Sequence, residues 1–166
     1  LRGAARGVWI MALPLAGMVQ LAFMPAGEAG VLEFLGQEIV LVRADRWSMV
    51  FAWVFLIAAA LNSIYSLHVR DAVQPAAGLS YAGAALGAVF AGDLLTLFVF
   101  WEAMALSSVF LIWARGTERA LRAGMRYLVI QVVSGVALLA GAIMRLNDTG
   151  SIGFDYIGLD GPASWV

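Results

Sequence analysis

Apolar residues in this chain gather into long runs that are separated by short polar stretches. A helix needs roughly 17–25 residues to cross the hydrocarbon core of a bilayer, and five runs have about that length. They are residues 8–24, 47–67, 75–91, 94–114 and 121–144. We therefore predict an all-α integral membrane chain with about five transmembrane helices, forming a single membrane domain over residues 1–166.

Composition supports a membrane location. The chain is 63% hydrophobic and 13% charged, whereas soluble domains are about 45–50% apolar and about 25% charged. The net charge of −1 provides no basic surface for nucleic acid. Cysteine is absent, which excludes disulfides and thiolate metal sites, and no Gly-rich phosphate loop is present. We expect no cofactor, no bound metal and no nucleic-acid partner.

The polar connection between the first two runs leaves its local structure open. Residues 38–42 alternate weakly and are rich in β-branched side chains, which is typical of a short strand. They form either a hairpin arm lying against the membrane face or a plain loop.

Arginine placement predicts the orientation of the spans, because cytoplasmic loops carry an excess of Lys and Arg. All ten basic residues are arginine. With five spans, seven fall on one side and three on the other, so we expect the amino terminus in the cytoplasm. The first side holds Arg2, Arg6, Arg70, Arg115, Arg119, Arg122 and Arg126, and the second holds Arg43, Arg46 and Arg145.

The third run carries small residues at four-residue spacing, at Gly83, Gly87 and Ala91. Small residues at this spacing let helix backbones approach closely in lipid. We expect this helix to be an interior one that touches several neighbours.

The fifth run begins after Thr117, a favourable N-cap residue. The arginines in its first turns are typical of an anchor in which charged heads extend to lipid headgroups. Deeper in the run, Gln131, Ser134 and Gly135 share one face. Their polar side chains either bridge helices or hold water.

Glu102 is the one charge inside the run 94–114. It lies nine residues past Asp93, which is about 13.5 Å along a helix and close to mid-membrane. A charged carboxylate at that depth costs on the order of 2.5–3.5 kcal/mol. Glu102 is therefore either a protonated residue that joins two helices or a group that carries protons.

Two stretches resemble a known family. Residues 92–112, GDLLTLFVFWEAMALSSVFLI, are similar to a GD-x-x-x-LFVF-x-E segment of the antiporter-like membrane subunits found in Mrp-type cation/proton antiporters and respiratory complex I. Residues 116–135, GTERALRAGMRYLVIQVVSG, resemble the next helix of that family. The resemblance is strongest with the D subunit of the Mrp Na⁺/H⁺ antiporters, and one departure is Thr96, where relatives often have asparagine.

The resemblance implies that Glu102 is the proton-translocating carboxylate of a half-channel, with its proton affinity set by a lysine on a later helix. It implies exchange of a monovalent cation, Na⁺ above all, for protons by a subunit of a hetero-oligomeric complex in the bacterial inner membrane. Such a subunit is a transporter and not an enzyme. Gln131, Ser134 and Asp93 are candidates for a polar relay to Glu102.

Two alternatives remain open. One is a proton-pumping membrane subunit of a complex I-like NADH-quinone oxidoreductase, which would make the whole complex a translocase. The other is a membrane scaffold without an ion path.

The family places this glutamate on its fifth helix, with the chain starting outside, whereas here the glutamate is on the fourth and the chain starts inside. One additional amino-terminal helix would reconcile the two arrangements. Residues 145–166 are predicted to be a polar external segment leading to further helices, one of which carries the partner lysine. We expect the chain to be the front part of a larger subunit.

Overall fold

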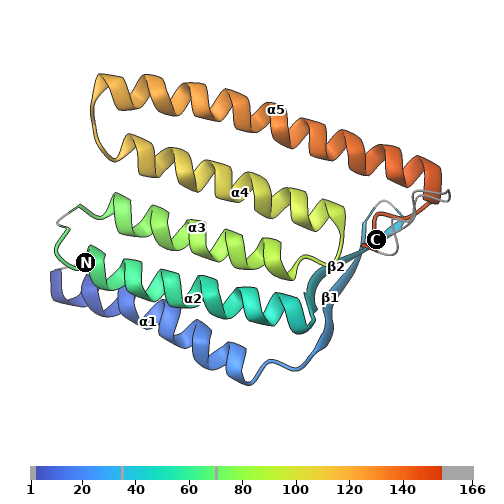
Figure 1. Ribbon diagram of the computed structural model, residues 1–166, viewed down its shortest axis with the longest axis horizontal. Helices are drawn as coiled ribbons and strands as arrows, with labels where there is room; N and C mark the ends of the chain where they lie inside the picture. The colour runs from blue at the N-terminus through green and yellow to red at the C-terminus, as the bar shows by residue number, and fades with distance from the viewer. Residues whose placement is uncertain (1–2, 35, 70, 155–166) are drawn as a thin grey trace.

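The computed structural model describes residues 3–34, 36–69 and 71–154, and these form helices with one β-hairpin between the first two (Figure 1). All five predicted runs are helical, and each boundary lies within a few residues of the expected one except at the two ends of the last helix and the start of the first. The elements are α1 (Gly3–Ala22), β1 (Gly27–Phe34), β2 (Gln37–Ala44), α2 (Arg46–Ser66), α3 (Val73–Phe90), α4 (Leu94–Trp113) and α5 (Glu118–Thr149).

The helices pack in chain order, α1 on α2, α2 on α3, α3 on α4 and α4 on α5, and α1 also touches α3. Figure 1 shows them side by side in one layer, with neighbouring helices antiparallel. The hairpin and the end of α5 lie at one end of this layer. The amino terminus and the α2–α3 and α4–α5 connections lie at the other, which we call the arginine end because Arg115 and Arg119 are there.

Arg2 and Arg70, which the orientation argument also uses, lie outside the described residues. Successive connections between the helices lie at alternate ends of the layer, as predicted (Figure 1). The cytoplasmic placement of the arginine end stays a prediction.

Among the described residues, α2, α4 and α5 are long and apolar enough to cross a membrane. The apolar part of α1, Arg6–Ala22, is shorter, and α1 contains Pro14. α3 (Val73–Phe90) has 18 residues, and polar residues such as Gln74 and Ser80 interrupt its apolar sequence. The prediction of about five spans therefore has direct support for three helices and stays a prediction for α1 and α3.

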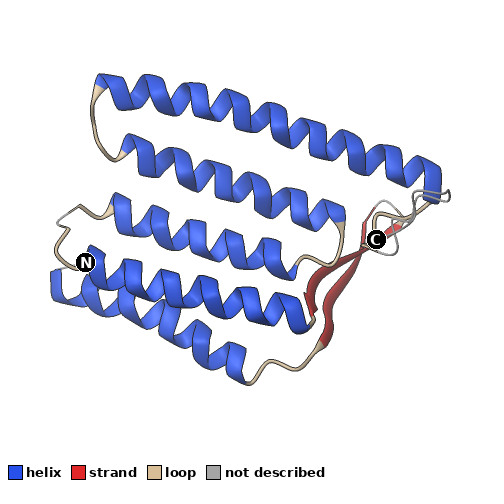
Figure 2. Cartoon of the chain, viewed as in Figure 1, coloured by secondary structure: helices blue, strands red, loops and turns tan. Residues whose placement is uncertain are grey.

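The hairpin corrects the expectation of a purely helical chain (Figure 2). β1 and β2 pair antiparallel, with Glu28 opposite Arg43 and Glu33 opposite Glu38. Residues 38–42, which the sequence left open, lie in β2. β1 is exposed along its length, whereas β2 buries Ile39 and packs against α2, α3 and α4. β2 is thus the strand that joins the hairpin to the helix ends.

The described core is small and lies where α1, α2 and α3 meet. Leu21, Ala52 and Leu56 form a buried cluster, with Met18 and Phe90 packed against it. Many large apolar side chains are exposed instead, which suits a helix layer surrounded by lipid. On α2 and α5 these include Phe51, Val54, Ile57, Leu61, Val129, Ile130, Val133 and Val136.

α3 is an interior helix of the layer, as predicted, since it contacts α1, α2, α4 and β2. A Cβ atom added to Gly87 would lie 2.6 Å from Cγ of Phe100 on α4, so this glycine permits close packing. Gly83 is exposed, and a Cβ there would meet nothing within 4 Å. Of the glycines that were predicted to permit close packing between helices, Gly87 does so and Gly83 does not.

Candidate functional site

Glu102 lies near the middle of α4, which begins after its N-cap residue Asp93 and ends at Trp113. The Glu102 side chain is half-buried. Its Oε1 atom is buried and has no hydrogen-bond partner within the described part of the chain. A buried polar atom without a partner is costly, so this oxygen is a place where a proton or a further polar group is required.

The carboxyl group of Glu102 is packed against the backbone of α5 at Gly135. A Cβ atom added to Gly135 would overlap Oε1 and would lie 2.7 Å from Cδ of Glu102. Gly135 is buried. Only glycine leaves room for the carboxyl group at this point of the α4–α5 interface.

A second contact of the same kind lies further along the same α4–α5 interface, between Trp113 and Gly124. A Cβ on Gly124 would lie 2.7 Å from Cδ1 of Trp113, and the Trp113 Nε1 atom is also buried without a partner among the described residues. Trp113 lies eleven residues after Glu102, and Gly124 lies eleven residues before Gly135. Because α4 and α5 are antiparallel, equal spacings place both pairs in one alignment. The buried residues of α5 are all small: Ala120, Gly124, Gly135 and Ala142.

The other predicted relay residues on α5 lie close to this contact in sequence. Gln131 is half-buried and lies one helical turn before Gly135, on the same face. Ser134 is adjacent to Gly135 and exposed. Their part in a relay stays a prediction.

Asp93 is buried, with 1% of its surface exposed. Its Oδ1 accepts a hydrogen bond from the backbone N–H of Thr96 at 2.7 Å. Its Oδ2 accepts one from the backbone N–H of Val40 at 2.8 Å and another from the Thr96 hydroxyl at 2.8 Å. The carboxylate therefore caps α4 and ties it to β2. A relay role for Asp93 stays a prediction beside this structural one.

Backbone contacts reinforce the Asp93 junction. The N–H of Gly92 donates to the carbonyl of Val40 at 3.0 Å, and the N–H of Leu94 donates to the carbonyl of Ile152 at 3.0 Å. A Cβ on Gly92 would lie 2.6 Å from Cβ of Val40. Gly92 therefore lets the chain approach β2 closely, and the start of α4 is held from two sides.

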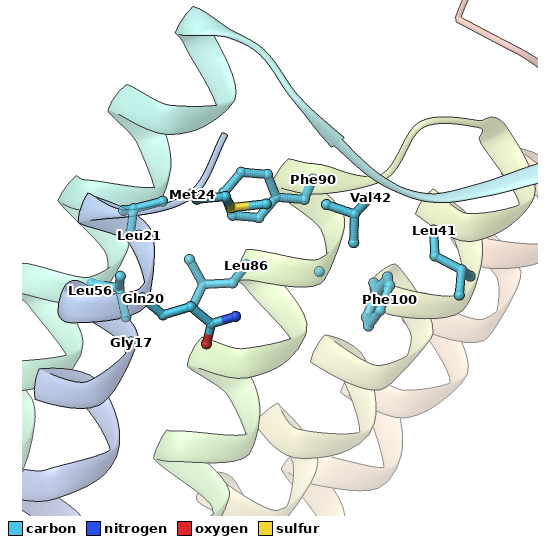
Figure 3. A pocket seen from close by; sticks show the side chains of 11 residues that line it. Gly17, Gln20, Leu21, Met24, Leu41, Val42, Leu56, Leu86, Phe90 and Phe100 are labelled. Carbon is cyan, nitrogen blue, oxygen red and sulfur yellow. The ribbon is translucent and has the colours of Figure 1, made fainter. Parts of the chain in front are cut away.

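The Glu102 site is a contact between helices and not part of the cavity shown in Figure 3. That cavity has a volume of ≈ 250 Å³. Its walls come from α1, α2, α3, α4 and β2, and Gln20 is the polar side chain among them. Glu102 does not line it, although Phe100, two residues earlier, does. Among the described residues no group of three or more His, Asp or Glu is placed to hold a metal ion.

Comparisons with known proteins place this site in a recognised segment. Residues 91–165 match a family model described as NADH:quinone oxidoreductase/Mrp antiporter, TM. The chain is 38% identical over 66 residues to the D subunit of the Na(+)/H(+) antiporter of Alkalihalophilus pseudofirmus, covering 40% of this chain and 13% of that protein. It is 26% identical over 118 residues to the D subunit of the Na(+)/H(+) antiporter of Bacillus subtilis, covering 68% of this chain and 24% of that one.

The fold is also similar to a solved one. A chain in the structure of the membrane-bound sulfane sulfur reductase, an archaeal respiratory membrane complex, superimposes with a TM-score of 0.66 and 20% identity. The superposition covers 89% of this chain and 31% of the other. The chain therefore spans less than a third of the length of each of these three proteins.

Proposed function

Because the chain is related to the membrane subunits of NADH:quinone oxidoreductase and Mrp antiporters, we propose that it is part of an ion-transporting subunit in which Glu102 takes up and releases protons. The proposed transport is exchange of Na⁺ for H⁺, the activity in the names of the two antiporter relatives. The proposed setting is a hetero-oligomeric complex in the bacterial inner membrane, where the other subunits are the partners.

One observation carries this proposal, namely that the Oε1 atom of Glu102 in the α4–α5 contact has no hydrogen-bond partner among the residues that the structure describes. A carboxylate at this depth is stabilised when it binds a proton, or when a cation comes near. The protonated and deprotonated forms of Glu102 differ by one proton, and a group that translocates protons must alternate between these two forms. A carboxyl group that only joined two helices would instead have a hydrogen-bond partner on the neighbouring helix.

The neighbouring residues have distinct parts in this proposal. Gly135 lets the carboxyl group lie against the α5 backbone, since a Cβ atom at this position would overlap Oε1. Gln131 and Ser134 hold the water through which protons reach Glu102. Asp93 fixes the start of α4. The resemblance to the antiporter-like family implies that a lysine on a later helix sets the proton affinity of Glu102, and this sequence contains no lysine.

Replacing Glu102 with Gln in the full complex tests the assignment. Glutamine keeps the size of the side chain and removes its titration, so Na⁺-driven proton movement in membrane vesicles should collapse while the complex still assembles. The matched control is Glu118→Gln, an exposed carboxylate in the first turn of α5, which should leave exchange intact. Unchanged exchange with Glu102→Gln would reject the mechanism and favour a scaffold.

A proton-pumping role in a complex I-like oxidoreductase is the second candidate, because the matching family model covers both kinds of subunit. Vesicles separate the two roles. An antiporter dissipates an imposed pH gradient when Na⁺ is added without any electron donor. A pump moves protons only while quinone is being reduced by other subunits, and Glu102→Gln should then lower the number of protons moved per electron pair.

The proposed orientation has its own test, since the chain has no cysteine. A single cysteine at Glu118, at the arginine end, should react with a membrane-impermeant thiol reagent only from the cytoplasmic side. A single cysteine at Glu28, in the hairpin, should react only from the outside. The reverse pattern would overturn the predicted placement of the amino terminus.

A further inference from the structure

The connection between α4 and α5 lies at the arginine end of the layer (Figure 1). A second cavity lies there, where α4 ends and α5 begins. Its volume is ≈ 450 Å³. Its lining combines cationic and apolar side chains: Arg115, Arg119, Thr117, Leu111, Ile112, Ala120 and Ala123.

The two arginines at this cavity are available to a ligand. Arg115 and Arg119 are both exposed, and no carboxylate among the described residues forms an ion pair with either. Glu118 lies between them in sequence, yet it does not line the cavity. Two guanidinium groups without acidic partners favour an anion, above all a phosphate, which arginine binds through two hydrogen bonds at once.

Thr117 adds a third polar group. Its hydroxyl oxygen accepts a hydrogen bond from the backbone N–H of Ala120 at 3.1 Å as the N-cap of α5. A hydroxyl group has one proton to donate in addition to its acceptor sites. The Thr117 proton is therefore left for an oxygen atom in the cavity.

The rest of the cavity wall is apolar, which favours a phospholipid over inorganic phosphate as the bound molecule. Leu111 and Ile112 come from the last turn of α4, and Ala120 and Ala123 come from the first turns of α5. Inorganic phosphate gains nothing from such a wall, whereas a lipid acyl chain does. Both helices that form the corner are apolar enough to span a membrane, so the cavity opens where headgroups meet hydrocarbon.

We propose that this corner is a binding site for an anionic phospholipid. The headgroup phosphate lies between Arg115 and Arg119, and an acyl chain follows the wall formed by Leu111, Ile112 and Ala123. The site is separate from Glu102, and neither assignment depends on the other.

The test uses the purified chain in neutral detergent, with phosphatidylglycerol, phosphatidylcholine and inorganic phosphate as probes. Native mass spectrometry measures lipid binding, and thermal unfolding measures stabilisation. Phosphatidylglycerol should bind more tightly than phosphatidylcholine. Each of Arg115→Gln and Arg119→Gln should weaken that binding about fivefold, the equivalent of about 1 kcal/mol per basic residue.

Three further variants make the result specific. Arg122→Gln removes an exposed arginine of α5 that does not line the cavity, so it should bind phosphatidylglycerol as the parent chain does. Ala123→Leu fills the apolar wall without changing any charge, and it should weaken phosphatidylglycerol binding. Glu102→Gln should leave lipid binding unchanged.

Three outcomes would overturn the proposal. Equal losses in Arg122→Gln and Arg119→Gln would indicate diffuse attraction to a basic surface. Equal protection by inorganic phosphate and phosphatidylglycerol, with no effect of Ala123→Leu, would indicate a simple anion site. Undiminished phosphatidylglycerol binding after both cavity arginines are replaced would exclude the site.

Discussion

The Glu102 carboxyl group on α4 lies against the backbone of Gly135 on α5, at a point where a single added methyl group would overlap it. The Trp113 ring lies against Gly124 in the same alignment. In both pairs α4 contributes a large side chain whose polar atom has no partner in the described part of the chain, and α5 contributes a glycine. The α4–α5 interface therefore places buried polar atoms directly against the backbone of α5. The Glu102 carboxyl group is one of them, and it lies in a tightly packed and weakly polar environment.

Replacing Gly135 with Ala should displace the Glu102 carboxyl group or separate the two helices. The added Cβ would lie 2.7 Å from Cδ of Glu102, and overpacking of this kind costs about 1–3 kcal/mol. We expect a lower free energy of unfolding in mixed micelles, and reduced proton movement in vesicles that carry the full complex.

Gly141→Ala is the matched control for this variant, because Gly141 lies on the same helix and a Cβ there would meet nothing within 4 Å. Alanine is favoured over glycine inside a helix by up to about 1 kcal/mol. Gly141→Ala should therefore be neutral or stabilising, and should leave transport unchanged. Similar behaviour of the two variants would show that Gly135 does not constrain Glu102.

Asp93→Ala should loosen the junction between α4 and the hairpin. The change removes the cap of α4, worth about 1 kcal/mol, and leaves the part-buried N–H of Val40 without its acceptor, which costs about 1–3 kcal/mol more. We expect a total loss of about 2–4 kcal/mol in the free energy of unfolding. Hydrogen exchange should show faster opening in β2 and in the first turn of α4.

Asp71 provides a comparison for Asp93. Its carboxylate accepts hydrogen bonds from Val73 N–H at 3.1 Å and Gln74 N–H at 3.3 Å at the start of α3, but it is exposed and does not reach the hairpin. Asp71→Ala should cost less than about 1 kcal/mol. A loss as large as that of Asp93→Ala would mean that the link to Val40 adds nothing.

The helices could be predicted from the sequence because long apolar runs between polar stretches determine them directly. The Thr117 cap of α5 followed from residue type in the same way. The hairpin could not be decided, because β1 is exposed along its length and shows little alternation between buried and exposed positions. β2 buries Ile39 through contacts with three helices that are distant in sequence, so its own residues carry only part of the signal.

At the candidate site, the burial cost singles out Glu102 from sequence alone, but the sequence does not reveal that Gly124 and Gly135 face α4. It indicates only that Gly135 shares a face with Gln131 and Ser134. The equal spacing between Glu102 and Trp113 and between Gly124 and Gly135 was present in the sequence. It becomes informative only once α4 and α5 are known to be antiparallel neighbours. For Asp93 the sequence offers a relay role, which stays a prediction. Two of its three hydrogen bonds come from Thr96 nearby, but the third comes from Val40 of β2, which is more than fifty residues away and could not be foreseen.

The stability contributed by Asp45 should depend on pH. Asp45 is the N-cap of α2 and forms a capping box with Ser48. The hydrogen bond from the Ser48 backbone N–H, at 2.8 Å, is the main cause that holds the pKa of Asp45 below its ordinary value of 3.8. A lowered pKa in the folded state gives stability that is present above pH 3.8 and is lost as pH falls through the lower value.

The measurement compares the parent chain with Asp45→Ala in denaturant unfolding across a pH series. The difference should be about 1 kcal/mol near neutral pH and should shrink below pH 3.8. Ser48→Ala keeps the backbone donor, so its own unfolding should retain this pH dependence. A difference between parent and Asp45→Ala that stays constant through the acid range would contradict the assignment.

Two glycines four residues apart on α3 allow a final prediction about helix packing. A Cβ on Gly87 would overlap the Phe100 ring, which lines the cavity in Figure 3 together with Gly87, whereas a Cβ on Gly83 would meet open space. Gly87→Ala should therefore separate α3 from α4 and cost about 1–3 kcal/mol, while Gly83→Ala should gain up to about 1 kcal/mol from helix propensity. Adding Phe100→Leu to Gly87→Ala should recover part of the loss, because the smaller side chain leaves room for the methyl group. Equal effects of the two glycine substitutions in micelle unfolding would show that α3 and α4 do not pack this closely.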